Sequence, residues 1–423
     1  MSEDFLHYIW KFKLFNLKNL KTTSGEDIEI LSVGSHNTES GPDFFNAKIK
    51  IDNLIWAGQV EIHINSSDWY KHQHETDPVY LKTVLHVVMN YDMDVFDEVN
   101  NPIPTLELNG RISNQLIANY NHLKLAKHQL VCQGLTDDLD EFQTNQWLGR
   151  LLIERLERKV EEISKIHQFT KGNWEQTVFI QLAKNMGFKT NSLPMQLLAE
   201  EIDFKILIKA RNNVMVIESI LFGVAGLLEG DFDESYPNQL KKEFNHQKNK
   251  HQFTVLKKEI WKFGGVRPSN FPTLRLVQLA QIISKFGNLF EVFVRDFTVT
   301  KEWKELNVAA TSFWDTHYTL QKSSVQKKKS LGTSAVNMIL INTVAPLLFY
   351  YGKETANPSY QEKAIDLLES IPAENNSIIK RWGENNISAK RSSESQSLIE
   401  LTNNYCKPKK CLTCGIGKQI LKE

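Results

Sequence analysis

The chain has 423 residues, and its 50 Lys and Arg balance its 50 Asp and Glu, so the formal net charge is zero. This length allows two or three domains, and 41% hydrophobic residues with only 4 Cys exclude a disordered chain and a disulfide-stapled mini-protein. Zero net charge excludes a global basic field, so a nucleic acid or another charged partner would have to bind a local patch.

The first ten residues, MSEDFLHYIW, include two early acidic residues and no basic segment before a long apolar run. This pattern does not look like a signal peptide. The apolar stretch 336–351 contains two Asn and Pro346 and is shorter than the ~20 apolar residues of a membrane span. We therefore expect a buried helix at 336–351 and a cytoplasmic protein without membrane association.

Short β-branched and aromatic runs, broken by Gly, Asn, Asp and Pro, fill residues 27–110 and predict strands, with helices at 3–14 and 69–80. From residue 140 onward, apolar residues recur at helical spacing and most of the chain is expected to be helical. The fold class is therefore α+β. We expect an α/β domain over residues 1–135, a mostly helical domain over 136–400, and a Cys-rich tail, 401–423, that packs on the rest.

The segment 40–64 carries the most informative chemistry. Asp43 follows a Gly-Pro turn and opens a strand, and a hairpin turn at Asp52-Asn53 leads to a second strand with Glu61 and His63. Residues two apart on a strand share a face, and Asp43 lies on the adjoining hairpin arm. Two carboxylates suit Mg²⁺ or Mn²⁺, and a third group beside the metal can orient or deprotonate an attacking water. This pattern indicates phosphodiester hydrolysis.

These residues resemble the PD-(D/E)XK nuclease superfamily, in which Pro-Asp on one hairpin arm is followed by Asp/Glu-X-Lys on the next. Pro42-Asp43 lies eighteen residues before Glu61, and His63 takes the place of the lysine. The resemblance implies a restriction-endonuclease-like domain, Asp43 and Glu61 as metal-binding carboxylates, and His63 as the water-positioning group. It also implies a further acidic residue from the preceding helix, for which Glu3 is the candidate. Since histidine titrates at about pH 6.5, His63 is a base, a metal ligand or a sign that activity is lost.

Four of the 12 histidines lie between residues 61 and 86. On a helix, His72 and His74 would point about 200° apart, so both would face one metal only if the segment were extended. We expect one of them, together with Asp77, to be an outer-shell or DNA-facing group. His86, inside the apolar run VLHVV, is expected to be a core histidine.

Over nearly its full length the chain also resembles an uncharacterised bacterial family, domain of unknown function 2851. The segments that carry this resemblance are GPDFFNAKI, GQVEIHINSSDW, RPSNFPTLRLVQLA and the C-terminal cysteine cluster. The resemblance implies no activity. It implies that the α/β part, the helical part and the Cys-rich tail belong to one architecture.

Cys406, Cys411 and Cys414 form a C-x4-C-x2-C cluster with interleaved lysines, and Cys132 is the fourth cysteine of the chain. Three closely spaced thiols beside lysines are typical of metal ligands, and Cys132 would complete a four-cysteine set. Zinc and an iron–sulfur cluster both fit this set. The alternative is a tail with free or weakly zinc-binding thiols.

Arg267, in the loop before a proline-initiated helix, and the run Lys327, Lys328 and Lys329 are the candidate phosphate contacts. Two functional hypotheses follow. The first is a nuclease that uses Mg²⁺ or Mn²⁺ and acts on nucleic acid, with DNA favoured over RNA. The second is a non-catalytic binding or scaffold protein that keeps a nuclease fold.

Overall fold

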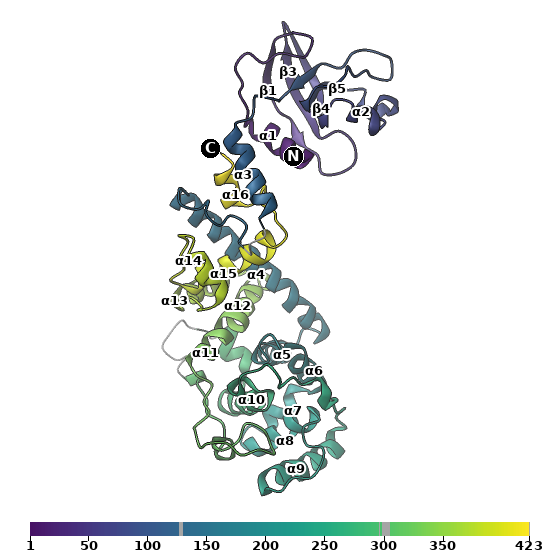
Figure 1. Ribbon diagram of the computed structural model, residues 1–423. Coiled ribbons are helices and arrows are strands. Elements are labelled where there is room, and N and C mark those ends of the chain that lie inside the picture. The colour runs from purple at the N-terminus through teal and green to yellow at the C-terminus, as the bar shows by residue number, and fades with distance from the viewer. Residues whose placement is uncertain (127–129, 296, 298–304, 423) are drawn as a thin grey trace. The chain divides into compact units, whose positions relative to one another are not determined.

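The computed structural model describes residues 1–126, 130–295, 297 and 305–422 (Figure 1). The chain forms two compact units. Unit 1 contains Met1–Trp147, Lys380–Ile387 and Glu400–Glu423, and unit 2 contains Leu148–Ile379 and Ser388–Ile399. The sequence predicted a boundary near residue 135 and a tail, 401–423, that packs on the rest. In the structure Lys380–Ile387 and Glu400–Glu423 belong to unit 1 together with Met1–Trp147.

A curled six-stranded sheet forms the β part of unit 1. Its strands are β1 (Ile28–Ser32), β2 (Ser35–His36), β3 (Phe44–Ile51), β4 (Leu54–Asn65), β5 (Thr83–Asn90) and β6 (Thr105–Glu107). The order is β1-β3-β4-β5-β6, with β2 beside β3. The β1/β3 and β3/β4 pairs are antiparallel, and the β4/β5 and β5/β6 pairs are parallel. All of these strands lie within residues 27–110, where the sequence predicted strands.

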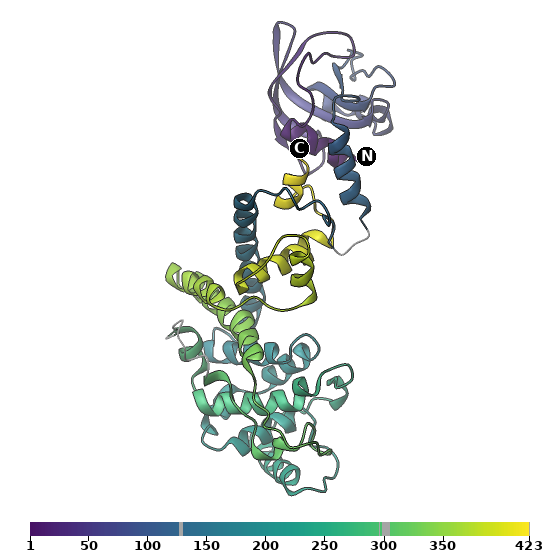
Figure 2. The same ribbon diagram turned by 60° about the vertical axis from the view of Figure 1, so that its left-hand side comes forward.

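The hairpin between β3 and β4 has the predicted two-residue turn. Ile51 pairs with Leu54, and Asp52 between them has a φ of 49°, a left-handed conformation that Asp and Asn adopt more readily than most residues. Beyond the hairpin, β4 becomes buried from Val60 to His63, where β5 pairs with it and α1 (Glu3–Phe12) packs against it. Figure 2 shows α1 close beside the sheet. Polar residues in this part of β4 are therefore removed from water.

The segment after β4 is not the single helix that the sequence predicted over 69–80. It consists of α2 (Asp68–Lys71) and two 3-10 turns, η1 (His74–Thr76) and η2 (Pro78–Tyr80). Gln73 has a left-handed φ of 62° and ends the first turn, and Asp77 is extended because it precedes a proline. The helical prediction is wrong here because two local backbone breaks interrupt the pattern.

The remaining helices are divided between the two units. Those placed in unit 1 are α3 (Asn114–Leu125) and α16 (Gly415–Ile420), and η9 (Thr402–Cys406) precedes α16. The helices wholly or largely in unit 2 are α4 (Glu141–Phe169), α5 (Trp174–Met186), α6 (Ser192–Glu201), α7 (Phe204–Lys209), α8 (Val214–Val224), α9 (Ser235–His251), α10 (Pro272–Phe286), α11 (Thr333–Ile339), α12 (Ala345–Glu354), α13 (Pro358–Ser370) and α15 (Ser392–Leu401), and α14 (Ser377–Gly383) crosses the division between the units.

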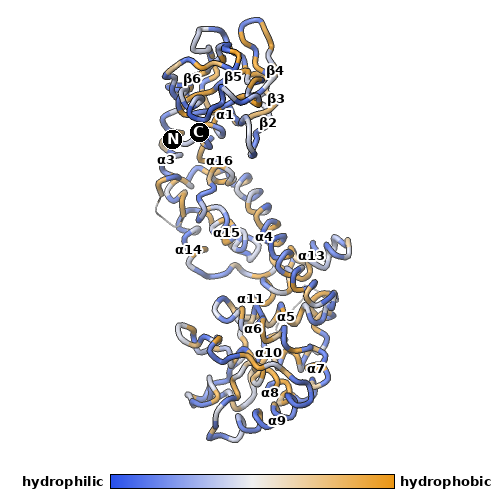
Figure 3. Tube along the Cα trace, turned by 90° about the vertical axis from the view of Figure 1, so that its right-hand side faces the viewer, coloured by the Kyte–Doolittle hydropathy of each residue, from blue (hydrophilic) through white to orange (hydrophobic). Residues whose placement is uncertain are grey.

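The core of unit 2 is built around α8 and α10. Both helices are mostly apolar, whereas α9 is mostly polar and buries only Pro237, Leu240 and Phe244 (Figure 3). Gly223 lets α8 pack closely against α9, because a Cβ at that position would lie 2.0 Å from the ring of Phe244 on α9. The helical pattern of the sequence thus becomes an irregular helical unit with one continuous core.

The apolar stretch near residue 340 is a helix that belongs to this core. Among the described residues, Thr333–Glu354 is long and apolar enough to cross a membrane by length and composition, and 72% of its apolar window is buried inside the protein. A buried core helix also meets these criteria of length and composition. The predicted buried helix is confirmed, and it is longer than the sequence indicated.

Glu218 on α8 is a carboxyl group buried in the core of unit 2, 1% exposed. Burial raises its pKa to about 7, although hydrogen bonds from Tyr236 and Thr311 favour the charged form. The folded protein therefore keeps a proton that the unfolded chain releases above its ordinary pKa of 4.5, so this group makes stability fall as pH rises from 4.5 towards 7.

We expect Glu218→Gln to raise the free energy of unfolding at pH 8 by up to about 3 kcal/mol and to change it little at pH 5, because glutamine resembles the protonated acid. Denaturant unfolding at both pH values measures this difference. Glu161→Gln, at an exposed position of α4, is the matched control. An equal gain at both pH values would contradict the assignment of a protonated Glu218.

Candidate metal centre

Imidazole side chains gather at the buried end of β4. His63 is 1% exposed, and its Nδ1 lies 2.8 Å from Nε2 of His86 on β5. Its Nε2 lies 3.0 Å from Nδ1 of His72, at the end of α2. The His74 ring stacks at 5.3 Å from the His63 ring and at 3.8 Å from the ring of Tyr80. His63 is therefore at the centre of a histidine cluster formed by His63, His72, His74 and His86.

The break in the segment after β4 explains how His72 and His74 both join this cluster. His72 caps α2, Gln73 has the left-handed conformation, and His74 opens η1. One ring nitrogen from each of His63, His72 and His74 lies within 4.8 Å of the others. The expectation that only one of His72 and His74 faces the site was wrong, because it assumed a continuous helix.

The two predicted carboxylates lie beside the histidine cluster. Glu61 is 5% exposed, and its Oε1 lies 3.2 Å from Nε2 of His74 and 3.7 Å from Nε2 of His63. Its Oε2 accepts a hydrogen bond of 3.1 Å from the backbone N–H of Asp43. Asp43 Oδ2 in turn accepts a hydrogen bond of 2.9 Å from Ile62 N–H. The hairpin thus brings Asp43, Glu61 and His63 together.

α1 contributes a histidine that the sequence analysis missed. His7 Nε2 lies 3.1 Å from Oδ2 of Asp43, whereas Glu3, the predicted acidic residue, lies one turn earlier in the first turn of α1. The signal was present as the i, i+4 spacing of Glu3 and His7, but only the packing of α1 on β4 decides which of them reaches Asp43.

Burial keeps His63 and His86 of the cluster uncharged at neutral pH. Burial, followed by the neighbouring imidazoles, lowers the pKa of His63 to about 2, and burial lowers that of His86 to about 3. Burial also raises the pKa of Glu61; the neighbouring His74 opposes this rise, and the charge of Asp43 adds to it. For His7, burial lowers the pKa, but the hydrogen bond and charge of Asp43 outweigh it and raise it. His63, next to Glu61, therefore offers a lone pair and no positive charge.

These donors fit a transition-metal ion. His74 Nε2 is buried and has no hydrogen-bond partner among the described residues; it lies 3.2 Å from Glu61 Oε1, but without hydrogen-bond geometry. Imidazoles suit Zn²⁺, Mn²⁺ and Fe²⁺, whereas Mg²⁺ prefers an all-oxygen shell. His63, His72 and His74 would hold the ion, with Glu61 as a fourth ligand or as the group that faces a bound water.

The other predicted site residues lie elsewhere. Asp77 is exposed and caps η2 by accepting a hydrogen bond of 3.0 Å from Val79 N–H. Arg267, Lys327 and Lys328 are exposed residues of unit 2. Lys329 is 6% exposed, and its Nζ donates to the carbonyl oxygen of Asp315 at 2.8 Å. Lys329 is therefore a structural residue of its loop, which corrects its prediction as a phosphate contact.

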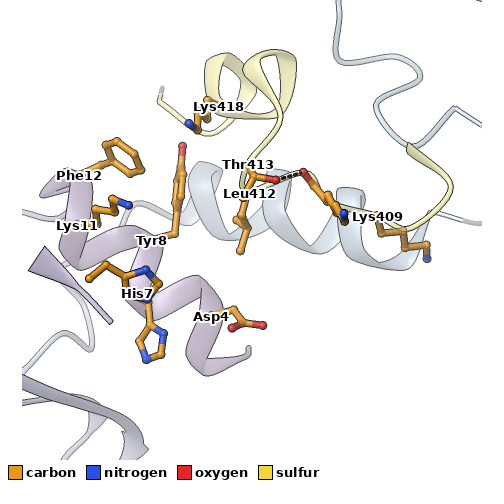
Figure 4. Close-up of a pocket in the computed structure, with 11 residues that line it drawn as sticks. Asp4, His7, Tyr8, Lys11, Phe12, Lys409, Leu412, Thr413 and Lys418 are labelled. Atoms are coloured by element: carbon orange, nitrogen blue, oxygen red, sulfur yellow. Dashed lines mark hydrogen bonds between the residues drawn. The ribbon is translucent and has the colours of Figure 1, made fainter. Parts of the chain in front are cut away.

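A groove of about 590 Å³ lies between α1 and the C-terminal tail within unit 1 (Figure 4). Its lining is predominantly basic and aromatic: Asp4, His7, Tyr8, Lys11, Phe12, His36, Lys409, Lys410, Leu412, Thr413 and Lys418. The Phe12 ring centroid lies 6.0 Å from Nζ of Lys11 and 5.7 Å from Nζ of Lys418. Because His7 lines this groove and also contacts Asp43, the basic groove adjoins the predicted carboxylates.

The fold and the site together define a mixed α+β protein with a histidine–carboxylate cluster on its sheet. Residues 3–377 match the family described as Protein of unknown function (DUF2851), and the chain belongs to this family. No curated protein and no solved structure matches the chain. The family resemblance of the sequence is thus confirmed, whereas no relative supports the PD-(D/E)XK resemblance.

Proposed function

We propose that the protein is a metal-dependent hydrolase of phosphodiester bonds in nucleic acid. The convergence of His63, His72 and His74 with Glu61, next to Asp43, carries this proposal. Three imidazoles and a carboxylate, of which His63 and Glu61 are buried, are the ligand chemistry of hydrolytic metal centres. The donor set favours Mn²⁺ or Zn²⁺, and Mg²⁺ is expected to bind less well.

Each side chain of the site would have a different role once an ion is bound. The bound ion would polarise a phosphoryl oxygen and acidify a water. Glu61 Oε1 faces the ligand nitrogens, while Oε2 is fixed by Asp43 N–H, so the carboxylate is oriented to accept a proton from that water. Asp43, held by Ile62 N–H, orients the ring of His7 at the edge of the groove. His86 holds Nδ1 of His63, which leaves Nε2 to face the site.

The groove between α1 and the tail supports nucleic acid as the substrate. Lysine ammonium groups bind backbone phosphates, and exposed aromatic rings stack with bases. The ammonium groups in the groove are those of Lys11, Lys409, Lys410 and Lys418. The exposed aromatic ring is that of Phe12, which is 39% exposed. A strand in this groove would bring a phosphate to His7 and so towards Asp43. This local patch reconciles a nucleic-acid substrate with zero net charge.

The test is cleavage of labelled single-stranded DNA, double-stranded DNA and RNA by the full chain with Mn²⁺, Zn²⁺ or Mg²⁺. We expect cleavage with Mn²⁺ or Zn²⁺ to exceed cleavage with Mg²⁺. His74→Ala should lower the rate by more than about 100-fold, beyond the loss that outer-shell changes cause.

His122→Ala, at an exposed position of α3, is the matched control and should cleave like wild type. Cleavage that survives in His74→Ala or in chelator would contradict the proposal. No cleavage of any substrate, together with metal-independent binding of nucleic acid, would favour the non-catalytic binding or scaffold alternative.

A further inference from the structure

All four cysteines of the chain meet in unit 1, although Cys132 is separated from the other three by all of unit 2. Cys132, Cys406, Cys411 and Cys414 line one small cavity, whose remaining lining is mostly apolar. None of them forms a disulfide, and only Cys411 is partly exposed. Four free thiols that converge from distant parts of a chain are the arrangement expected of a metal site.

The backbone around the tail cysteines is fitted closely to this cavity. The backbone N–H groups of Ile416 and Gly417 hydrogen-bond the sulfur of Cys414. A Cβ at Gly417 would lie 2.2 Å from the carbonyl oxygen of Cys411, and one at Gly415 would lie 2.5 Å from the ring of Trp147. Glycines at both positions therefore let the chain turn tightly around the sulfurs, and N–H groups aimed at a sulfur stabilise a thiolate.

Without a metal, these thiols are in an unfavourable setting for ionisation. Burial raises the pKa of Cys132 to about 12 and that of Cys411 to about 11, and it also raises those of Cys406 and Cys414. The charges of the neighbouring thiolates raise the pKa values of Cys132, Cys406 and Cys411 further. A bound cation reverses this effect, because it replaces the thiol protons and neutralises the sulfurs together.

We propose that Cys132, Cys406, Cys411 and Cys414 are the four ligands of a thiolate-bound metal centre. A single zinc ion and an iron–sulfur cluster both take four cysteine thiolates, and the metal content of the protein distinguishes them.

This inference is independent of the proposed hydrolase activity, but it has a consequence for the groove. Lys409 and Lys410 lie between the ligands Cys406 and Cys411 and line the groove beside α1. Asn119 of α3 donates a hydrogen bond of 3.0 Å to the carbonyl oxygen of Ile420 and ties the end of the tail to the same unit. The metal centre would therefore hold the lysines of the tail in position on the groove.

The test uses the full chain purified without oxygen, with iron, sulfide and zinc measured per chain. We expect near-stoichiometric bound metal, lost in Cys411→Ser and in Cys132→Ser, and retained in Lys407→Ala, an exposed control within the tail. A brown protein with iron and sulfide would identify the centre as an iron–sulfur cluster, and one zinc per chain in a colourless protein would identify it as a zinc site. Metal that remains bound in both cysteine variants would overturn the four-cysteine centre.

A measurement on the wild type keeps the test valid if a variant fails to fold. Thiol titration of the native protein should find the four thiols protected, and removal of the metal should expose all of them. Absence of iron and zinc, with four thiols that react before any treatment, would overturn the proposal. Disulfide formation within this set in protein purified without oxygen would overturn it as well.

Discussion

Glu61→Gln is expected to lower the rate of metal-dependent cleavage by about 10²- to 10⁴-fold, the range for loss of a positioned general base. Glutamine keeps the size of the side chain and can still accept the hydrogen bond from Asp43 N–H, but it has no negative charge to share with the ion or to accept a proton from water. Initial rates at saturating Mn²⁺ measure this loss. Glu29→Gln, on the exposed face of β1, is the matched control in the same sheet.

Metal affinity separates the two roles open to Glu61. If Glu61 is a base that faces the bound water, the variant should bind Mn²⁺ nearly as tightly as wild type and lose only the rate. If Glu61 is a ligand, affinity and rate should fall together. Titration calorimetry on both proteins distinguishes these results. A variant with wild-type rate would show that the histidine–carboxylate cluster is not the catalytic site.

The metal-free protein should lose stability steeply as the pH falls below about 6.5, because His63 and His86 stay neutral in the folded state. Their folded pKa values, about 2 and about 3, lie below the ordinary 6.5, so the unfolded chain binds protons that the folded state does not. Stability then rises with pH over this window, by up to about 1.4 kcal/mol per pH unit for each group. Denaturant unfolding in chelator between pH 7 and pH 5 measures the slope.

His86→Gln isolates one of these two groups. Glutamine can still pair with His63 Nδ1 but does not titrate, so the slope below pH 6.5 should be smaller than in wild type, whatever the change in stability at pH 7. His122→Gln removes an exposed histidine and should leave the slope unchanged. An unchanged slope in His86→Gln would contradict the assignment of His86 as a buried neutral imidazole.

The sequence predicted those parts of the fold and site that depend on short-range geometry. Alternating apolar residues predicted the strands, and the two-residue turn predicted the hairpin, because side-chain direction along a strand repeats every second residue. The same periodicity predicted that Glu61 and His63 share a face. The helical pattern gave a wrong prediction over 69–80. It runs through Gln73 and Asp77, whose backbone conformations end the helix.

The sequence by itself determined the β3–β4 hairpin with Asp43, Glu61 and His63, the C-x4-C-x2-C set, and the division into a strand-rich and a helical part. Only the tertiary structure decided that His72 and His74 both face His63, that His7 and not Glu3 reaches Asp43, and that Cys132 joins the tail cysteines. The first set depends on spacing within one element, which backbone geometry fixes. The second set depends on which surfaces pack together across long stretches of chain, and the local pattern of residues does not specify that choice.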